Sequence, residues 1–220
     1  MVQKKANQLP SISTELAAIK GLYALTPDSS NTEDLLRRVR LALSGGVQVL
    51  QYRNKIANPA LRLAQARELR ELTREFGVIF IVNDDAQLAV TVDADGVHLG
   101  ASDGEITAAR ALLGHNKLIG VSCYNQLALA QSAVKAGADY VAFGAFYAST
   151  VKPDAAVATL DLLRKARAEL GVPVVAIGGI SADNGAVLVQ AGADALAVIS
   201  AVFDAADIQQ AAKKLTKLFR

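Results

Sequence analysis

The sequence predicts an α/β protein, a (β/α)8 TIM barrel, and three observations lead to this prediction. Eight short apolar runs recur along the 220 residues, each followed by a segment whose apolar side chains have helical spacing. Glycines close several of these helical segments, as is typical of helix C-termini. Polar side chains directly follow the apolar runs, at the strand ends where such barrels place their chemistry.

The expected strands are short runs rich in β-branched and aromatic residues. They span residues 21–26, 47–52, 78–82, 96–99, 118–121, 140–143, 174–177 and 195–199. The expected helices lie between them, at 32–43, 58–75, 86–90, 106–113, 126–136, 160–170, 184–190 and 206–218. Pro27 ends the first run, Asn31 or Thr32 caps the first helix, and Asn58-Pro59 opens the second.

Later boundaries repeat one pattern, in which a helix gives way to a strand through a short Gly-Ala-Asp sequence. It occurs at residues 137–139 and 192–194, and in the looser form Asp93-Ala94-Asp95-Gly96. A doubly wound open sheet is the alternative architecture, but no Gly-x-Gly-x-x-Gly follows the first strand. We therefore expect one barrel domain over residues 21–220, preceded by an N-terminal extension or lead-in helix over residues 1–20.

The run from Val78 to Val82 is uninterrupted, which indicates a strand buried on both faces. Asn83, Asp84 and Asp85 follow it directly. Either aspartate can cap the next helix, and oxygen ligands of this kind also suit Mg²⁺. This stretch leaves both interpretations open.

Composition limits the class of protein. Apolar residues make up 52% of the chain, charged residues 20%, and the net charge of +2 comes without a block of like charges. This favours a large core and argues against nucleic-acid binding. No apolar run has the length of a membrane span, and the single cysteine, Cys123, suits a reducing compartment. We expect a cytoplasmic protein, and leave open whether it forms a homo-oligomer.

If the barrel is correct, the strand ends bring cations, acids, hydroxyls and glycines to one mouth. These residues are Gln51, Arg53, Lys55, Asn83, Asp84, His98, Asp103, Ser122, Ser149, Thr150, Lys152, Gly178, Gly179 and Ser200. The set suits a phosphorylated substrate held with a divalent metal. Taken singly, His98 is interpreted as a satisfied core histidine because Val97 and Leu99 flank it.

Six motifs in order resemble the thiamine-phosphate synthase family. They are Gln51-Tyr52-Arg53-x-Lys55, Val82-Asn83-Asp84, Gly96-Val97-His98-Leu99-Gly100-x-x-Asp103, Gly120-Val121-Ser122, Ala176-Ile177-Gly178-Gly179-Ile180 and Val198-Ile199-Ser200-Ala201. The resemblance implies a transferase of thiamine biosynthesis that joins a hydroxymethylpyrimidine pyrophosphate to a thiazole phosphate and releases pyrophosphate.

The resemblance also implies roles for residues. Gln51, Tyr52, Arg53, Asn54 and Lys55 would hold the pyrimidine and its pyrophosphate, with a further contact from Asn83. Asp84 and Asp103 would hold Mg²⁺, and Ser122 and Lys152 would bind the pyrophosphate. The thiazole phosphate would lie against Ser149, Thr150, Val151, Gly179, Ile199 and Ser200. Arg53, Lys55 and Lys152 would be catalytic, by neutralising the leaving group.

Some positions depart from the family pattern. Ala101 stands where the family usually has glutamine, Tyr124 where it often has histidine, and Ala148 and Val151 replace a proline and a threonine. Two alternatives remain. The first is a thiazole tautomerase-like isomerase, which relies on a histidine near Tyr124. The second is a non-catalytic paralogue that binds a phosphorylated ligand, and the altered residues 144–152 favour it.

Overall fold

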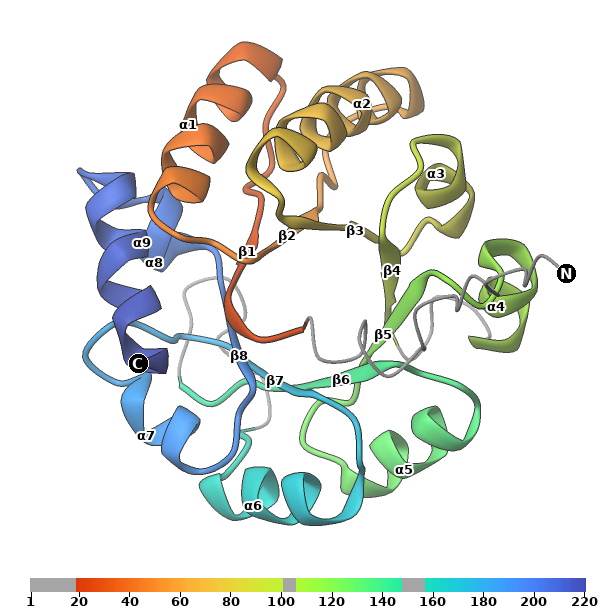
Figure 1. The fold of residues 1–220 in the computed structure, drawn as a ribbon, viewed down its shortest axis with the longest axis vertical. Coiled ribbons are helices and arrows are strands. Elements are labelled where there is room, and N and C mark those ends of the chain that lie inside the picture. The colour runs from red at the N-terminus through yellow and green to blue at the C-terminus, as the bar shows by residue number, and fades with distance from the viewer. Residues whose placement is uncertain (1–18, 101–105, 148–156) are drawn as a thin grey trace, which may run out of the picture.

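The computed structural model describes residues 19–100, 106–147 and 157–220, and they form a closed barrel of eight parallel strands in sequence order. The strands are β1 (Gly21–Leu25), β2 (Val49–Tyr52), β3 (Ile79–Asn83), β4 (Gly96–Leu99), β5 (Leu118–Ser122), β6 (Tyr140–Phe143), β7 (Val174–Ile177) and β8 (Ala195–Val198). Figure 1 looks into this inner ring of strands. The predicted fold class is confirmed.

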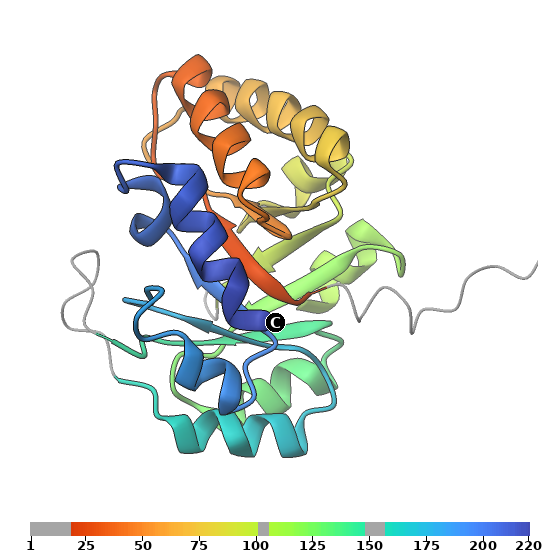
Figure 2. The same ribbon diagram turned by 60° about the vertical axis from the view of Figure 1, so that its left-hand side comes forward.

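Helices surround the strands (Figure 1). They are α1 (Thr32–Ser44), α2 (Pro59–Phe76), α3 (Ala86–Thr91), α4 (Ile106–Leu113), α5 (Leu127–Lys135), α6 (Leu160–Glu169), α7 (Ala186–Gln190), α8 (Ser200–Phe203), α9 (Ile208–Thr216) and the 3₁₀ turn η3 (Lys217–Phe219). Asn31 and Asn58 cap α1 and α2 through their side chains, as the sequence indicates. Helix α9 packs beside α1 and closes the ring (Figure 2).

The helices differ from the prediction in two places. The expected helix 184–190 begins only at Ala186, because the Asn184 side chain is bonded to the backbone of Ser181 and Gly179. Such local side-chain bonds compete with helix formation. The sequence analysis also missed α8, which starts at Ser200 directly after β8.

Alternation along the strands divides the core into two layers. The larger layer lies between strands and helices and includes Leu22 and Leu50. The smaller fills the barrel interior and includes Tyr23, Val49 and Tyr140. Every second side chain of a strand therefore points into the barrel, and those nearest the carboxyl ends form the floor of the mouth.

The aspartates of the Gly-Ala-Asp pattern hold the opposite end of the barrel together. Each carboxylate accepts a backbone N–H from the preceding strand and pairs with an arginine of an outer helix. The three sets are Asp95 with Phe80 and Arg70, Asp139 with Ile119 and Arg110, and Asp194 with Val174 and Arg167. Gly137 and Gly192 take the positive φ expected of them, and Asp93 does the same in the looser copy. No described helix is long and apolar enough to cross a membrane.

Candidate active site

A cavity of about 280 Å³ opens at the carboxyl ends of the strands. All eight strands or the residues just after them contribute to its wall. The lining residues are Tyr23, Leu25, Gln51, Arg53, Asn83, His98, Ser122, Tyr124, Ala142, Gly144, Ala145, Val175, Ile177, Gly178, Gly179, Ile180, Ala197, Val198, Ile199 and Ser200. Seven of the residues to which the resemblance assigns a role are among them: Gln51, Arg53, Asn83, Ser122, Gly179, Ile199 and Ser200. His98 and Gly178, also expected at the mouth, line it too.

Alternation divides the predicted segment 51–55. Gln51 and Arg53 line the cavity, whereas Tyr52 and Asn54 point away from it toward α2. The Tyr52 hydroxyl donates to Gln65 Oε1 at 2.8 Å, and Asn54 Nδ2 donates to the same oxygen at 2.9 Å. These two side chains therefore anchor the segment from outside the cavity, and a direct contact of the Tyr52 ring with substrate does not fit this orientation.

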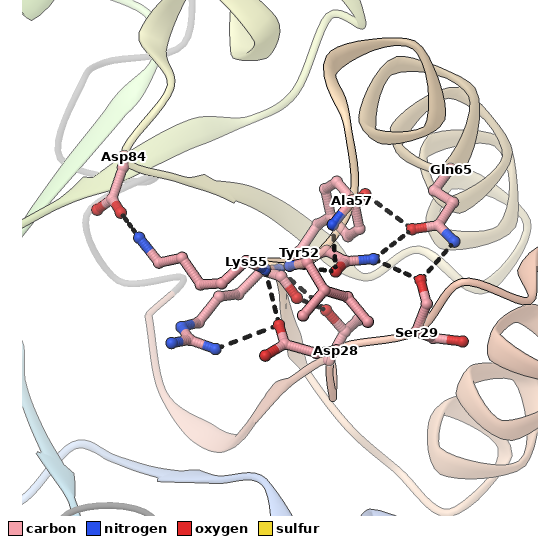
Figure 3. A network of polar contacts seen from close by, with 11 residues as sticks. Asp28, Ser29, Tyr52, Lys55, Ala57, Gln65 and Asp84 are labelled. Carbon is pink, nitrogen blue, oxygen red and sulfur yellow. Dashed lines mark hydrogen bonds and ion pairs between the residues drawn. The ribbon is translucent and has the colours of Figure 1, made fainter.

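The end of β1 supports the same segment, and the sequence analysis missed it. The buried Thr26 hydroxyl donates to the backbone oxygen of Arg53 and accepts its N–H, both at 2.9 Å. Asp28 Oδ1 accepts the backbone N–H of Lys55 at 2.8 Å and lies 3.4 Å from Arg53 Nη1 (Figure 3). The sequence offered one signal for Thr26 and Asp28: both closely follow the first strand, and so lie at the mouth.

The two aspartates after β3 have different roles. Asp85 caps α3, since its Oδ1 accepts the backbone N–H of Leu88 at 2.9 Å. Asp84 makes no such cap, takes φ 63° and presents its carboxylate to Lys55 Nζ at 2.5 Å (Figure 3). A non-glycine residue in this left-handed region is uncommon and strained. The capping interpretation therefore applies to Asp85 and not to Asp84.

His98 is buried, and both of its ring nitrogens have hydrogen-bond partners, as the sequence indicates. Nδ1 lies 3.1 Å from the Tyr140 hydroxyl and Nε2 lies 2.9 Å from Ser122 Oγ. Burial lowers the pKa of His98 to about 4, despite the opposing field of Asp84. The imidazole is therefore neutral near pH 7.

Glycines and a helix start form the opposite wall of the cavity. Gly178 and Gly179 both have positive φ, 103° and 63°, and a side chain at Gly178 would overlap the Ala145 methyl group. Ile199 and Ser200 lead directly into α8. Backbone N–H groups in a first helical turn have no intrahelical acceptor, and glycine lets a ligand approach the backbone closely.

Several predicted residues fall outside the described part of the chain. They are Asp103, Ser149, Thr150, Val151 and Lys152. Among the described residues, no group of three or more histidine, cysteine, aspartate or glutamate side chains could hold a metal ion. Asp84 is thus the predicted metal ligand whose surroundings are visible. A single carboxylate still fits Mg²⁺, which usually keeps several waters and takes the remaining ligands from substrate phosphates.

The fold and the pocket together define a class: a (β/α)8-barrel enzyme whose described cavity wall carries the cationic side chain of Arg53 and the Gly178-Gly179 turn. A family model described as thiamine monophosphate synthase matches residues 22–202. The chain belongs to this family of transferases.

Individual relatives agree with the family match. The thiamine-phosphate synthase of Methylobacillus flagellatus is 54% identical, over 93% of this chain and 97% of its own length. That of Thiobacillus denitrificans is 55% identical, over 90% and 94%. The solved structure of a thiamine phosphate pyrophosphorylase from Pyrococcus furiosus has a TM-score of 0.84 at 38% identity, covering 93% of this chain and 97% of that one.

Proposed function

We propose that this enzyme condenses 4-amino-2-methyl-5-hydroxymethylpyrimidine pyrophosphate with 4-methyl-5-(2-phosphooxyethyl)thiazole to give thiamine phosphate and pyrophosphate. One observation carries the proposal beyond family membership: a single cavity has Arg53 on one wall and the Gly178-Gly179 turn and Ser200 on another. Two anion-binding walls facing one cavity suit a reaction between two phosphorylated substrates.

The pyrimidine pyrophosphate is proposed to bind along β2, β3 and β5. Gln51, Arg53, Asn83 and Ser122 line the cavity wall, and Lys55 pairs with Asp84, the residue after Asn83. Arginine and lysine neutralise the charge that grows on departing pyrophosphate. Lys152, assigned to the same task by resemblance, would add a third cation.

Mg²⁺ is proposed to bind through Asp84 together with Asp103. Asp84 supports this because Asp85, and not Asp84, caps the helix, which leaves the Asp84 carboxylate for an exposed cation. When bound, the ion would supply charge neutralisation to the leaving pyrophosphate. The Asp84 carboxylate pairs with Lys55 Nζ, which shows that it is accessible to a cation.

The thiazole phosphate is proposed to bind at Gly179, Ile199 and Ser200, with Ser149, Thr150 and Val151 completing the site. The carbon–oxygen bond to pyrophosphate would break to leave a pyrimidinylmethyl cation stabilised by the ring amine. The thiazole nitrogen would then attack that carbon. The protein has to position two substrates and balance charge, and it needs no nucleophile of its own.

The two alternative functions have less support. The tautomerase relies on a histidine near residue 124, and this chain has tyrosine there, 46% exposed at the cavity. The non-catalytic alternative rests on Ala148 and Val151, which lie outside the described residues. A cytoplasmic setting remains our proposal, supported by the single buried cysteine thiol of Cys123.

The test is a direct assay. The purified chain is incubated with both substrates and Mg²⁺, and thiamine phosphate and pyrophosphate are measured together. We expect equal amounts of the two products, and none when either substrate is omitted. No product under conditions in which a related synthase turns over would refute the proposal.

A further inference from the structure

Five side chains form one hydrogen-bonded chain across the barrel interior beneath the cavity. Gln51 Nε2 donates to the Tyr23 hydroxyl at 2.7 Å, and the Tyr23 and Tyr140 hydroxyls lie 3.0 Å apart. Tyr140 continues to His98 Nδ1 at 3.1 Å, and His98 Nε2 continues to Ser122 Oγ at 2.9 Å. The residues come from five strands, so only the closed barrel brings them together.

The donors and acceptors give this hydrogen-bond chain a direction. The Gln51 amide nitrogen can only donate, so the Tyr23 oxygen accepts from it. The Tyr140 oxygen is the other described hydrogen-bond partner of Tyr23, so the buried Tyr23 proton is satisfied when it goes to Tyr140. The proton of Tyr140 then goes to His98 Nδ1. A neutral imidazole that accepts at Nδ1 carries its proton on Nε2, and there it donates to Ser122 Oγ.

The protonation states agree with this direction. Burial raises the pKa of Tyr23 and of Tyr140, so both phenols keep their protons. The barrel also makes room for the chain: a side chain at Gly120 in β5 would overlap the Tyr140 ring. Tyr23 and Tyr140 are 1% and 0% exposed, so water does not compete for their hydroxyls.

We propose that Tyr23, Tyr140 and His98 are positioning residues that fix the direction of this hydrogen-bond chain. Its two ends then present an acceptor, Gln51 Oε1, and a donor, the Ser122 hydroxyl, to the cavity. This inference rests on the proposed function. Gln51 Oε1 accepts a hydrogen bond from the amino group of the pyrimidine, and the Ser122 hydroxyl donates one to an oxygen of its pyrophosphate. The hydrogen-bond chain would thus make the enzyme selective for an amino-substituted ring over its oxo analogue.

The position of the His98 proton tests the direction without any substrate. The protein has two histidines, so long-range ¹H–¹⁵N spectra of the labelled full chain contain two imidazoles, and His115→Gln assigns them. We expect His98 to carry its proton on Nε2 at pH 8. In Tyr140→Phe the Nδ1–H form should increase, because Nδ1 has lost its donor. Nδ1–H in the wild type, or an unchanged tautomer in Tyr140→Phe, would overturn the proposal.

Kinetics test the positioning role. Tyr23→Phe and Tyr140→Phe keep the rings and remove one hydroxyl each, so we expect the KM for the pyrimidine pyrophosphate to rise about two- to tenfold, as for one lost neutral hydrogen bond. The KM for the thiazole phosphate should not change. Thr73→Val removes a buried hydroxyl in α2 whose one hydrogen bond within the described residues goes to Arg70 O, and serves as the matched control. Equal changes in both KM values would contradict the proposal.

The two proposals fail separately. If the wild type makes no thiamine phosphate, the proposed function fails, but the His98 tautomer still tests the direction of the hydrogen-bond chain. If the wild type is active but His98 carries its proton on Nδ1, only the hydrogen-bond chain is refuted.

Discussion

Lys55 Nζ lies 2.5 Å from Asp84 Oδ2 and joins the segments that follow the paired strands β2 and β3 (Figure 3). The cation expected to hold pyrophosphate is thus paired with the carboxylate expected to hold Mg²⁺. The side chains are 53% and 25% exposed, and exposed ion pairs contribute little to stability. The pair therefore holds two binding groups close together, and separating them costs little free energy.

The first prediction separates the two aspartates after β3. Asp84→Asn should raise the Mg²⁺ concentration for half-maximal activity at least tenfold, because a neutral amide is a weaker ligand, while asparagine still tolerates the positive φ. Asp85→Asn is the control, since asparagine also caps helices. Activity is measured over a Mg²⁺ series. An unchanged Mg²⁺ dependence in Asp84→Asn would remove this residue from the metal site.

The second prediction concerns Asp28, which holds the Lys55 backbone. Asp28→Ala should lower kcat/KM for the pyrimidine pyrophosphate about tenfold, because it loses a hydrogen bond of about 1–3 kcal/mol to a charged acceptor that orients Arg53 and Lys55. Asp28→Asn should recover most of the loss, because its amide oxygen can still accept the N–H. Steady-state kinetics with the thiazole phosphate saturating provide the measurement. Equal activity of all three proteins would show that the segment needs no support from Asp28.

The third prediction concerns two neighbours that the resemblance assigns to different substrates. Lys152→Ala should mainly lower kcat, because charge on the leaving pyrophosphate grows in the transition state. Val151→Thr should mainly lower the KM for the thiazole phosphate, by a few-fold to about a hundredfold, if it restores a hydrogen bond of about 1–3 kcal/mol. Both constants are measured for wild type and single variants. An unchanged kcat in Lys152→Ala would exclude this lysine from the mechanism.

The fourth prediction compares the Gly-Ala-Asp aspartates at the far end of the barrel. Asp95→Ala should destabilise the fold by about 3–5 kcal/mol, because it leaves the guanidinium of Arg70, whose side chain is only 11% exposed, without its carboxylate partner. Asp194→Ala should cost only about 1–3 kcal/mol, since Arg167 is 58% exposed and the main loss is the bond to Val174 N. Urea denaturation measures both. Equal losses would mean that burial of the arginine does not matter.

The fold could be predicted from local signals. Strand and helix periods, Asn31 and Asn58 as caps, and glycines at positive φ each act within a few residues, so the order of eight strand–helix units follows from the chain alone. The place of the site also followed, because parallel strands send every carboxyl end to one mouth. Hence Gln51, Arg53, Asn83 and Ser122 could be named before their geometry was known.

Only the tertiary structure decided which side chains share the cavity. Asp84 and Asp85 are alike in sequence, and the turn after β3 gives the cap to one and the ion pair to the other. Tyr23 and Tyr140 are 117 residues apart, yet their hydroxyls touch because β1 and β6 face each other across the barrel. Sequence patterns report the preferences of near neighbours, whereas closure of the barrel sets distances between residues that no local preference connects.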